Sequence, residues 1–168
     1  MIFKASMDTF TRNMTIMIST LIVGITFVCL FSVDDYKNFT SILFIFTFLF
    51  LVLIVLIYKP LRYKINESSI IVDRLFSPVN IMRSNIKEIY KLQDFSTFSA
   101  FRLFGVGGFF GYFGLYWNKK YGRMTYYATN GAAAIMIITN DNKKIVITPD
   151  NDAAFLEYFL KQNDVLSN

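Results

Sequence analysis

Two long uncharged stretches occupy much of the first third of the chain. Residues 15–33 and residues 39–58 comprise nineteen and twenty residues, and neither stretch carries a charged side chain. A helix rises about 1.5 Å per residue, so each stretch is long enough to cross a hydrocarbon core of about 30 Å. Only residues 34–38 lie between them, and so short a link requires an antiparallel arrangement. The pattern therefore predicts a transmembrane helical hairpin over residues 14–58.

Basic residues near the ends of the two spans indicate the orientation of the hairpin. Lys4 and Arg12 precede the first span, and three basic residues follow soon after the second, whereas the link combines one lysine with two aspartates. Because cytoplasmic flanks are enriched in lysine and arginine, we expect both termini in the cytoplasm. Residues 1–13 then form a cytoplasmic N-terminal segment. Its loose apolar alternation is compatible with an added strand or with a frayed lead-in to the first span.

Beyond the second span, charge returns and short apolar runs alternate with turn residues. A change of period after Pro149 predicts a helix over 153–162, with acidic residues at its start. These elements predict an α+β membrane protein in which the hairpin precedes a cytoplasmic domain, residues 59–168. We expect this domain to be a small β-barrel or sandwich closed by the C-terminal helix. The strand-like runs are 70–76, 81–83, 86–92, 123–129, 133–139 and 143–148.

The amino-acid composition excludes several kinds of catalytic and metal-binding site. Apolar residues make up 54% of the chain and charged residues only 17%, and there is no histidine and a single cysteine. This excludes a disulfide framework, a Cys/His zinc site and a Ser-His-Asp triad. Asp150 and Asp152 form the one dense carboxylate cluster, and a helix N-terminus already accounts for negative charge there. We therefore expect no catalytic residue, no metal site, no cofactor and no enzymatic activity.

Several local motifs resemble a known family. The chain reads Arg102-Leu103-Phe104-Gly105-Val106-Gly107-Gly108, and an isoleucine-rich run ends in Thr148-Pro149-Asp150 before the last helix. With Gly111–Gly114 and residues 127–130, this pattern resembles the bacterial pleckstrin-homology-like (PH-like) domain families over roughly residues 60–162. The resemblance implies a bent antiparallel sheet of about seven strands capped by the last helix, in proteins tethered to the bacterial inner membrane. It transfers no catalytic residue.

The segment Leu103–Trp117 is apolar, uncharged and rich in glycine, and four interpretations of it can be considered. A dinucleotide-binding loop is disfavoured because Phe110 stands where G-x-G-x-x-G needs its third glycine. A third span is disfavoured because fifteen helical residues cover only about 22 Å. Two interpretations stay open. The glycines allow a bent, closely packed backbone with aromatic residues in the core, or the aromatic residues form an exposed edge at a membrane interface or partner surface.

The second of these interpretations defines a candidate binding set for lipid or a partner. Net charge supports it, because the whole excess of +5 lies in residues 59–168. Basic side chains beside an anionic leaflet favour headgroup contact, and the same charge suits an acidic protein. The aromatic members are Phe109, Phe110, Tyr112, Phe113, Tyr116 and Trp117, and the flanking basic members are Arg102, Lys119, Lys120 and Arg123.

These observations predict a non-catalytic interaction or scaffolding module anchored in the inner membrane. Its partners are membrane lipids through the two spans and a membrane or cytoplasmic protein that adds a strand to an open sheet edge. The alternative is a sensor of anionic lipid that uses the basic and aromatic candidates. Nucleic acid is disfavoured as a partner, because the basic residues are dispersed and no recognition motif is present.

Overall fold

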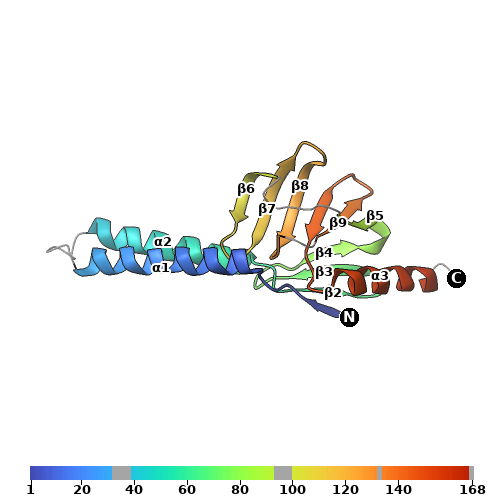
Figure 1. Ribbon diagram of the computed structural model, residues 1–168, viewed down its shortest axis with the longest axis horizontal. Coiled ribbons are helices and arrows are strands. Elements are labelled where there is room, and N and C mark those ends of the chain that lie inside the picture. The colour runs from blue at the N-terminus through green and yellow to red at the C-terminus, as the bar shows by residue number, and fades with distance from the viewer. Residues whose placement is uncertain (32–38, 93–99, 132–133, 167–168) are drawn as a thin grey trace.

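The computed structural model describes residues 1–31, 39–92, 100–131 and 134–166. A pair of long helices, α1 (Thr9–Phe31) and α2 (Phe39–Tyr58), projects from one side of a unit made of two β-sheets and helix α3 (Asp152–Leu166). Figure 1 shows the two helices side by side, with the sheets gathered at the end that holds the N-terminus of α1. The predicted link at 34–38 lies outside the described residues.

The helices agree in part with the predicted spans. Among the described residues, Thr9–Val28 is long and apolar enough to cross a membrane, and Ile42–Tyr58 is a shorter apolar helix. Helix α1 begins earlier than the predicted span, because the carboxylate of Asp8 accepts a hydrogen bond from the backbone N–H of Thr11 at 2.7 Å. Such a bond caps the first turn of a helix. Apolar side chains along both helices are exposed.

The first sheet has the order β1-β2-β3-β4 and is antiparallel throughout. Its strands are β1 (Ile2–Lys4), β2 (Arg62–Ile65), β3 (Ser69–Asp73) and β4 (Val79–Met82). The N-terminal segment therefore adds a strand to the sheet, as one of the two alternatives for residues 1–13 predicted. Phe3 holds it in place, since this side chain is buried with its ring centre 5.0 Å from that of Phe155.

The second sheet has the order β5-β9-β10-β8-β7-β6. A short 3-10 turn, η1 (Arg83–Asn85), leads from the first sheet into it. The pairs are antiparallel except for β8 and β10, which run parallel. Its strands are β5 (Ile86–Lys91), β6 (Phe101–Gly107), β7 (Tyr112–Asn118), β8 (Gly122–Ala128), β9 (Ile135–Thr139) and β10 (Lys144–Ile147).

This topology corrects two details of the predicted domain. The described residues form two open sheets and close no barrel, and they contain more strands than the seven expected. The additional strands arise in the glycine-rich segment, which forms part of β6 and most of β7. The sheet is also not wholly antiparallel. Strand β10 follows β9 as an antiparallel hairpin and lies between β9 and β8, where it runs parallel to β8.

The main core lies between the first sheet, one face of the second sheet and α3. Helix α3 confirms the predicted C-terminal helix, and the Asn151 side chain caps it by accepting a hydrogen bond from the N–H of Ala154 at 3.0 Å. Asp152 in its first turn forms an ion pair of 2.8 Å with Lys91 on β5. Fully buried members of this core include Tyr63, Ile65, Ile70, Val72, Ile137, Ile147 and Phe155.

Candidate interaction surface

The glycine–aromatic segment forms the antiparallel pair β6–β7. Gly105 and Gly114 are direct partners in this pair, and their φ angles are +114° and +122°. A Cβ atom on Gly105 would lie 2.2 Å from the carbonyl oxygen of Phe113. Glycine is therefore needed for the two backbones to approach this closely. Here the glycines allow a closely packed backbone, which is the structural role that the first of the two open interpretations gives them.

The turn between β6 and β7, residues 108–111, fixes the second sheet to the base of the hairpin. The backbone N–H of Phe110 donates to Oγ1 of Thr15 in α1 at 2.8 Å. The Lys59 ammonium, just after α2, lies 5.3 Å from the centre of the Phe110 ring, and burial lowers the pKa of that ammonium. Phe109 and Phe110 are half-buried, so these two candidates belong to the junction between the sheet and the hairpin.

The other aromatic candidates lie on β7 and differ in exposure. Tyr112, Phe113 and Tyr116 are buried, whereas Trp117 at the far end of the strand is exposed. Tyr112 and Tyr116 are buried because they pack into a second core cluster on the second sheet, which includes Tyr126. Tyr112, Phe113 and Tyr116 therefore do not form the exposed aromatic edge that the second interpretation requires.

Exposed apolar side chains lie instead on β6, the edge strand. Phe101 is 73% exposed and Phe104 is 80% exposed, and Leu103 between them is exposed as well. In the described part of the chain β6 has β7 as its only strand neighbour. Figure 1 shows β6 as the strand of the second sheet that lies nearest the hairpin. An exposed apolar edge strand of this kind is a recognised site of association.

The first sheet contributes exposed apolar residues at the same end of the molecule. Leu75 and Phe76, in the connection between β3 and β4, are both exposed. The backbone N–H of Phe76 lies 3.4 Å from the carbonyl oxygen of Ile57, close to the end of α2. Phe101 pairs with Trp117 and therefore lies at the other end of β6. We call Leu75, Phe76, Leu103 and Phe104, which lie closer to the base of the hairpin, the hairpin-side surface.

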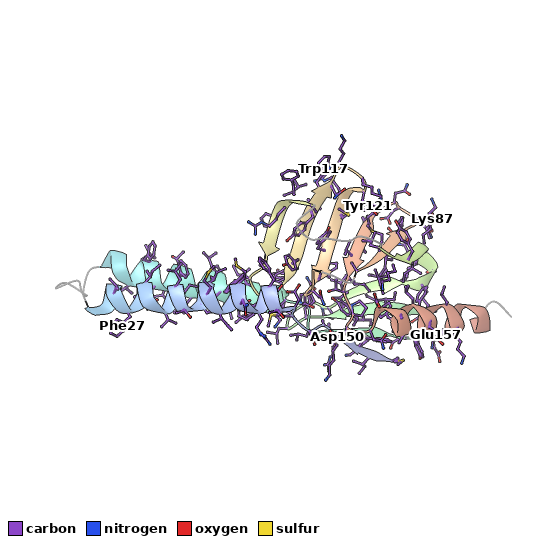
Figure 2. All side chains as sticks on the ribbon, in the orientation of Figure 1. Phe27, Lys87, Trp117, Tyr121, Asp150 and Glu157 are labelled. Atoms are coloured by element: carbon purple, nitrogen blue, oxygen red, sulfur yellow. The ribbon has the colours of Figure 1, made fainter. Side chains whose placement is uncertain are left out.

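Three of the four basic candidates lie at the opposite end of the second sheet. Lys119 and Lys120 are in the turn between β7 and β8, and Arg123 follows in β8. Figure 2 shows this end, marked by Trp117 and Tyr121, away from the hairpin. The side chain of the fourth basic candidate, Arg102, does not point toward that end of the sheet. A Cβ atom on Gly107 would lie only 3.1 Å from its Nη1 atom, so the guanidinium extends along β6 toward the hairpin base. The structure does not bring the four together.

The Arg102 side chain lines an open cleft of about 530 Å³ between α1 and the β6–β7 pair. The wall from α1 is apolar, and the wall from the sheet carries a guanidinium and two phenol groups. Gly107 provides room beside them, because a Cβ atom there would also lie 3.3 Å from the Tyr116 hydroxyl oxygen. The lining residues are Phe10, Met14, Ala100, Arg102, Gly107, Tyr112 and Tyr116.

The two phenol groups of the cleft differ in their hydrogen bonds. The hydroxyl of Tyr116 donates to the carbonyl oxygen of Val106, and burial raises its pKa, so it is a neutral phenol at cellular pH. Tyr112 is only 4% exposed, and its hydroxyl has no hydrogen-bond partner among the residues that the structure describes. An unpartnered buried hydroxyl is costly, which marks Tyr112 as a group with an unused donor.

The comparison with known proteins agrees with this fold. The family described as "Bacterial PH domain" matches residues 61–163, which is more than half of the chain. The chain belongs to this family. Searches of curated proteins and of solved structures gave no match. The match begins with β2 and ends within α3, so the bacterial PH domain includes both sheets except β1, while α1 and α2 precede it.

Sequence reasoning missed part of the surface of this bacterial PH domain. None of the exposed residues Leu75, Phe76, Phe101, Leu103 and Phe104 was a candidate, although Leu75 and Phe76 directly precede a Ser-Pro turn, where exposure is expected. Phe101 lies just before the segment that was singled out. The described part of this bacterial PH domain holds no cluster of three or more acidic or cysteine side chains that could bind a metal ion.

Proposed function

We propose that the chain is a membrane-anchored, non-catalytic interaction module whose bacterial PH domain lies against the inner surface of the inner membrane. Helices α1 and α2 are the anchor and cross the bilayer as a hairpin, with both termini in the cytoplasm. The proposal is supported by the apolar length of α1, the uncharged sequence of α2 and the basic residues that flank them.

One observation carries the proposal: the hairpin-side surface comes from two different sheets and flanks one end of the anchor. If the hairpin is in the bilayer, Phe76 lies beside the end of α2 and Phe104 lies on the strand nearest the hairpin. Both would then be at the level of the lipid headgroups, where aromatic side chains are favoured. Each phenylalanine that leaves water for an apolar environment contributes about 1.5–3 kcal/mol.

The charge of the domain supports the same placement. The net charge of +5 lies in residues 59–168, and a basic side chain near an anionic leaflet contributes about 1 kcal/mol of attraction. This attraction acts over roughly a Debye length, so it also reaches residues that do not touch lipid. It therefore does not require the four basic candidates to form one cluster.

A second candidate function is the addition of a partner strand to β6. The observation that favours it is the outer edge of β6, which pairs with no strand in the described part of the chain. Backbone hydrogen bonds along this edge would supply affinity, and the side chains of Phe101 and Phe104 would supply specificity. Such a partner would be a protein of the same membrane, because the edge lies beside the hairpin.

The placement can be tested with the full chain in lipid nanodiscs. Trp117→Phe removes the single tryptophan, and Phe104→Trp or Leu160→Trp then introduces one reporter at an exposed apolar position. Leu160 lies on α3 and serves as the matched control, because α3 is on the side of the domain away from the hairpin. We expect lipids with brominated acyl chains to quench Trp at position 104 strongly and Trp at position 160 weakly. Equal quenching at the two positions would overturn the placement.

Orientation has its own test. A reporter that works only in the cytoplasm should be active when it is fused after Asn168. A reporter that works only outside the cytoplasm should be active when it is inserted in the link at 34–38. An external C-terminus would contradict the two-span anchor, and it would leave the fold of the domain unaffected.

A further inference from the structure

The cleft between α1 and the β6–β7 pair combines two kinds of wall. Phe10 and Met14 belong to the first turns of α1, whereas Arg102 and Tyr112 belong to the sheet. We propose that this cleft binds the phosphate group of an acidic phospholipid, with the acyl chain of that lipid lying along α1. The inference rests on the proposed function for the source of the ligand, because it places the mouth of the cleft at the bilayer surface.

Arg102 supplies the anion-binding group. Its guanidinium forms no ion pair with an acidic side chain in the described part of the chain, whereas Arg62 is paired with Asp73 at 2.7 Å. The side chain is nevertheless held in the cleft, with Nη1 beside Gly107. A guanidinium offers several N–H donors in a planar fork that matches two phosphate oxygens. An unpaired guanidinium lining a cleft is therefore suited to a phosphate group.

Tyr112 supplies a second donor. Its hydroxyl is buried without a partner among the described residues, although Tyr112 lines the same cleft as Arg102. Because the hydroxyl oxygen is shielded from solvent in the free protein, a ligand oxygen in the cleft would satisfy it after a small movement of the Tyr112 side chain. The neighbouring hydroxyl of Tyr116 already donates to Val106 and is left with lone pairs only. A charged donor and an unused phenol donor on one wall indicate an anionic ligand with several oxygen acceptors.

The opposite wall indicates that the ligand also has an apolar part. Phe10 is exposed and Met14 is half-buried, and neither offers a group that a free phosphate would contact. Both lie on the helix that continues into the apolar stretch Thr9–Val28. A ligand with a phosphate at Arg102 and a hydrocarbon chain against Phe10 and Met14 would contact both walls. An acidic phospholipid of the inner leaflet has this combination.

Native mass spectrometry of the full chain can test the assignment. The protein is released from an uncharged detergent containing phosphatidylglycerol or phosphatidylcholine with the same acyl chains, and retained lipid is counted. We expect a phosphatidylglycerol adduct that Arg102→Gln weakens roughly tenfold, the loss expected for one charge-assisted contact. Arg123→Gln is the matched control, because it removes the same charge from an exposed position on β8. Tyr112→Phe should weaken the adduct several-fold while removing only one oxygen atom.

Equal adducts in the unsubstituted chain and in Arg102→Gln, or equal losses in Arg102→Gln and Arg123→Gln, would overturn the proposal. Displacement of the lipid by soluble glycerol phosphate would retain the phosphate chemistry and assign the cleft to a soluble phosphate ester. The proposed function fails separately. If Trp at position 104 is not quenched while the adduct depends on Arg102, the bilayer placement is wrong and the phosphate site stands. If Trp at position 104 is quenched and no adduct forms, the bilayer placement stands and the phosphate site is wrong.

Discussion

The backbone N–H of Phe110 donates a hydrogen bond of 2.8 Å to the hydroxyl oxygen of Thr15. That hydroxyl in turn donates to the carbonyl oxygen of Thr11, one helical turn earlier, at 2.7 Å. The two bonds connect the β6–β7 turn directly to the backbone of α1. They fix the bacterial PH domain to its proposed membrane anchor at the turn that joins β6 to β7.

Thr15→Val is expected to loosen this junction. Valine keeps the shape of the side chain but removes the acceptor, so the partly buried amide of Phe110 is left unsatisfied at a cost of about 1–2 kcal/mol. Hydrogen exchange of the amides at 108–111 should then be roughly 5–30-fold faster. Thr26→Val is the control, because Thr26 makes the same local bond to Ile22 within α1 but has no bond to the sheet. A similar change in both variants would show that the junction does not depend on Thr15.

The close approach of β6 and β7 leads to a second prediction. Gly105→Ala should destabilise the pair by at least about 2 kcal/mol, because the positive φ is strained for alanine and the new methyl would meet the Phe113 carbonyl. Gly107→Ala should change stability by less than about 1 kcal/mol. Its Cβ would meet the end of the flexible Arg102 side chain at 3.1 Å, and its φ is not in the strained range.

Denaturant titration of the two alanine variants in mild detergent can distinguish them. The single tryptophan, Trp117, is paired with Phe101 across β6 and β7, so its fluorescence reports on this pair. Comparable midpoints for Gly105→Ala and Gly107→Ala would contradict the structural role assigned to Gly105.

The contrast between these glycines shows what sequence could and could not predict. The hairpin helices, β3, β5, β8, β9 and α3 were predictable to within a few residues, because length, alternation and caps are local signals. The β6–β7 pair has no clear alternation, and its glycines make sense only once Gly105 is seen opposite Gly114. The parallel pairing of β8 with β10 likewise joins strands that are not consecutive in the chain, so no local signal predicts it.

The candidate site was less predictable for the same reason. On β6 the side chains of Phe101, Leu103 and Phe104 are exposed, whereas on β7 Tyr112 and Tyr116 pack into the second core cluster. The apolar segment that the sequence shows as continuous therefore contains both exposed and buried residues. The direction of the Arg102 side chain depends on the irregular register between Arg102 and Phe104 and on the missing side chain at Gly107. Neither could be inferred before the pairing was known.

A third prediction concerns alkaline pH. The fully buried hydroxyl of Tyr63 on β2 donates to the carbonyl oxygen of Tyr127 on β8 at 2.6 Å and accepts from the N–H of Thr148 at 3.2 Å. It therefore joins the two sheets. Burial, the largest cause, raises the pKa of Tyr63 from 10.0 to about 12. The protonated form is favoured in the folded state, so this contribution to stability is complete below pH 10 and is lost as the pH rises toward 12.

Tyr63→Phe should reduce the fall in unfolding free energy between pH 10 and 12. At neutral pH it should cost about 1–3 kcal/mol, because the buried N–H of Thr148 loses its acceptor. Buried Tyr126, whose pKa is also raised to about 12 by burial, should preserve part of the alkaline effect. Denaturant titrations across this pH range are the measurement, and an unchanged slope in the phenylalanine variant would show that Tyr63 does not ionise with unfolding.

A last prediction concerns the N-terminal strand, which leads directly into α1. Both carboxylate oxygens of Asp150 are used by Ser6, which donates from its backbone N–H at 2.8 Å and from its hydroxyl at 2.6 Å. Asp150→Ala removes both bonds and should loosen the chain just after β1, while the pairing of β1 with β2 and the packing of Phe3 remain. Cleavage by trypsin after Lys4 should become several-fold faster, in line with a loss of about 1–2 kcal/mol. Asp141→Ala is the control, because Asp141 contacts only groups of its own turn, Lys143 and Thr139. If Lys4 is cleaved at the same rate in both variants, β1 is held by the packing of Phe3 rather than by Asp150.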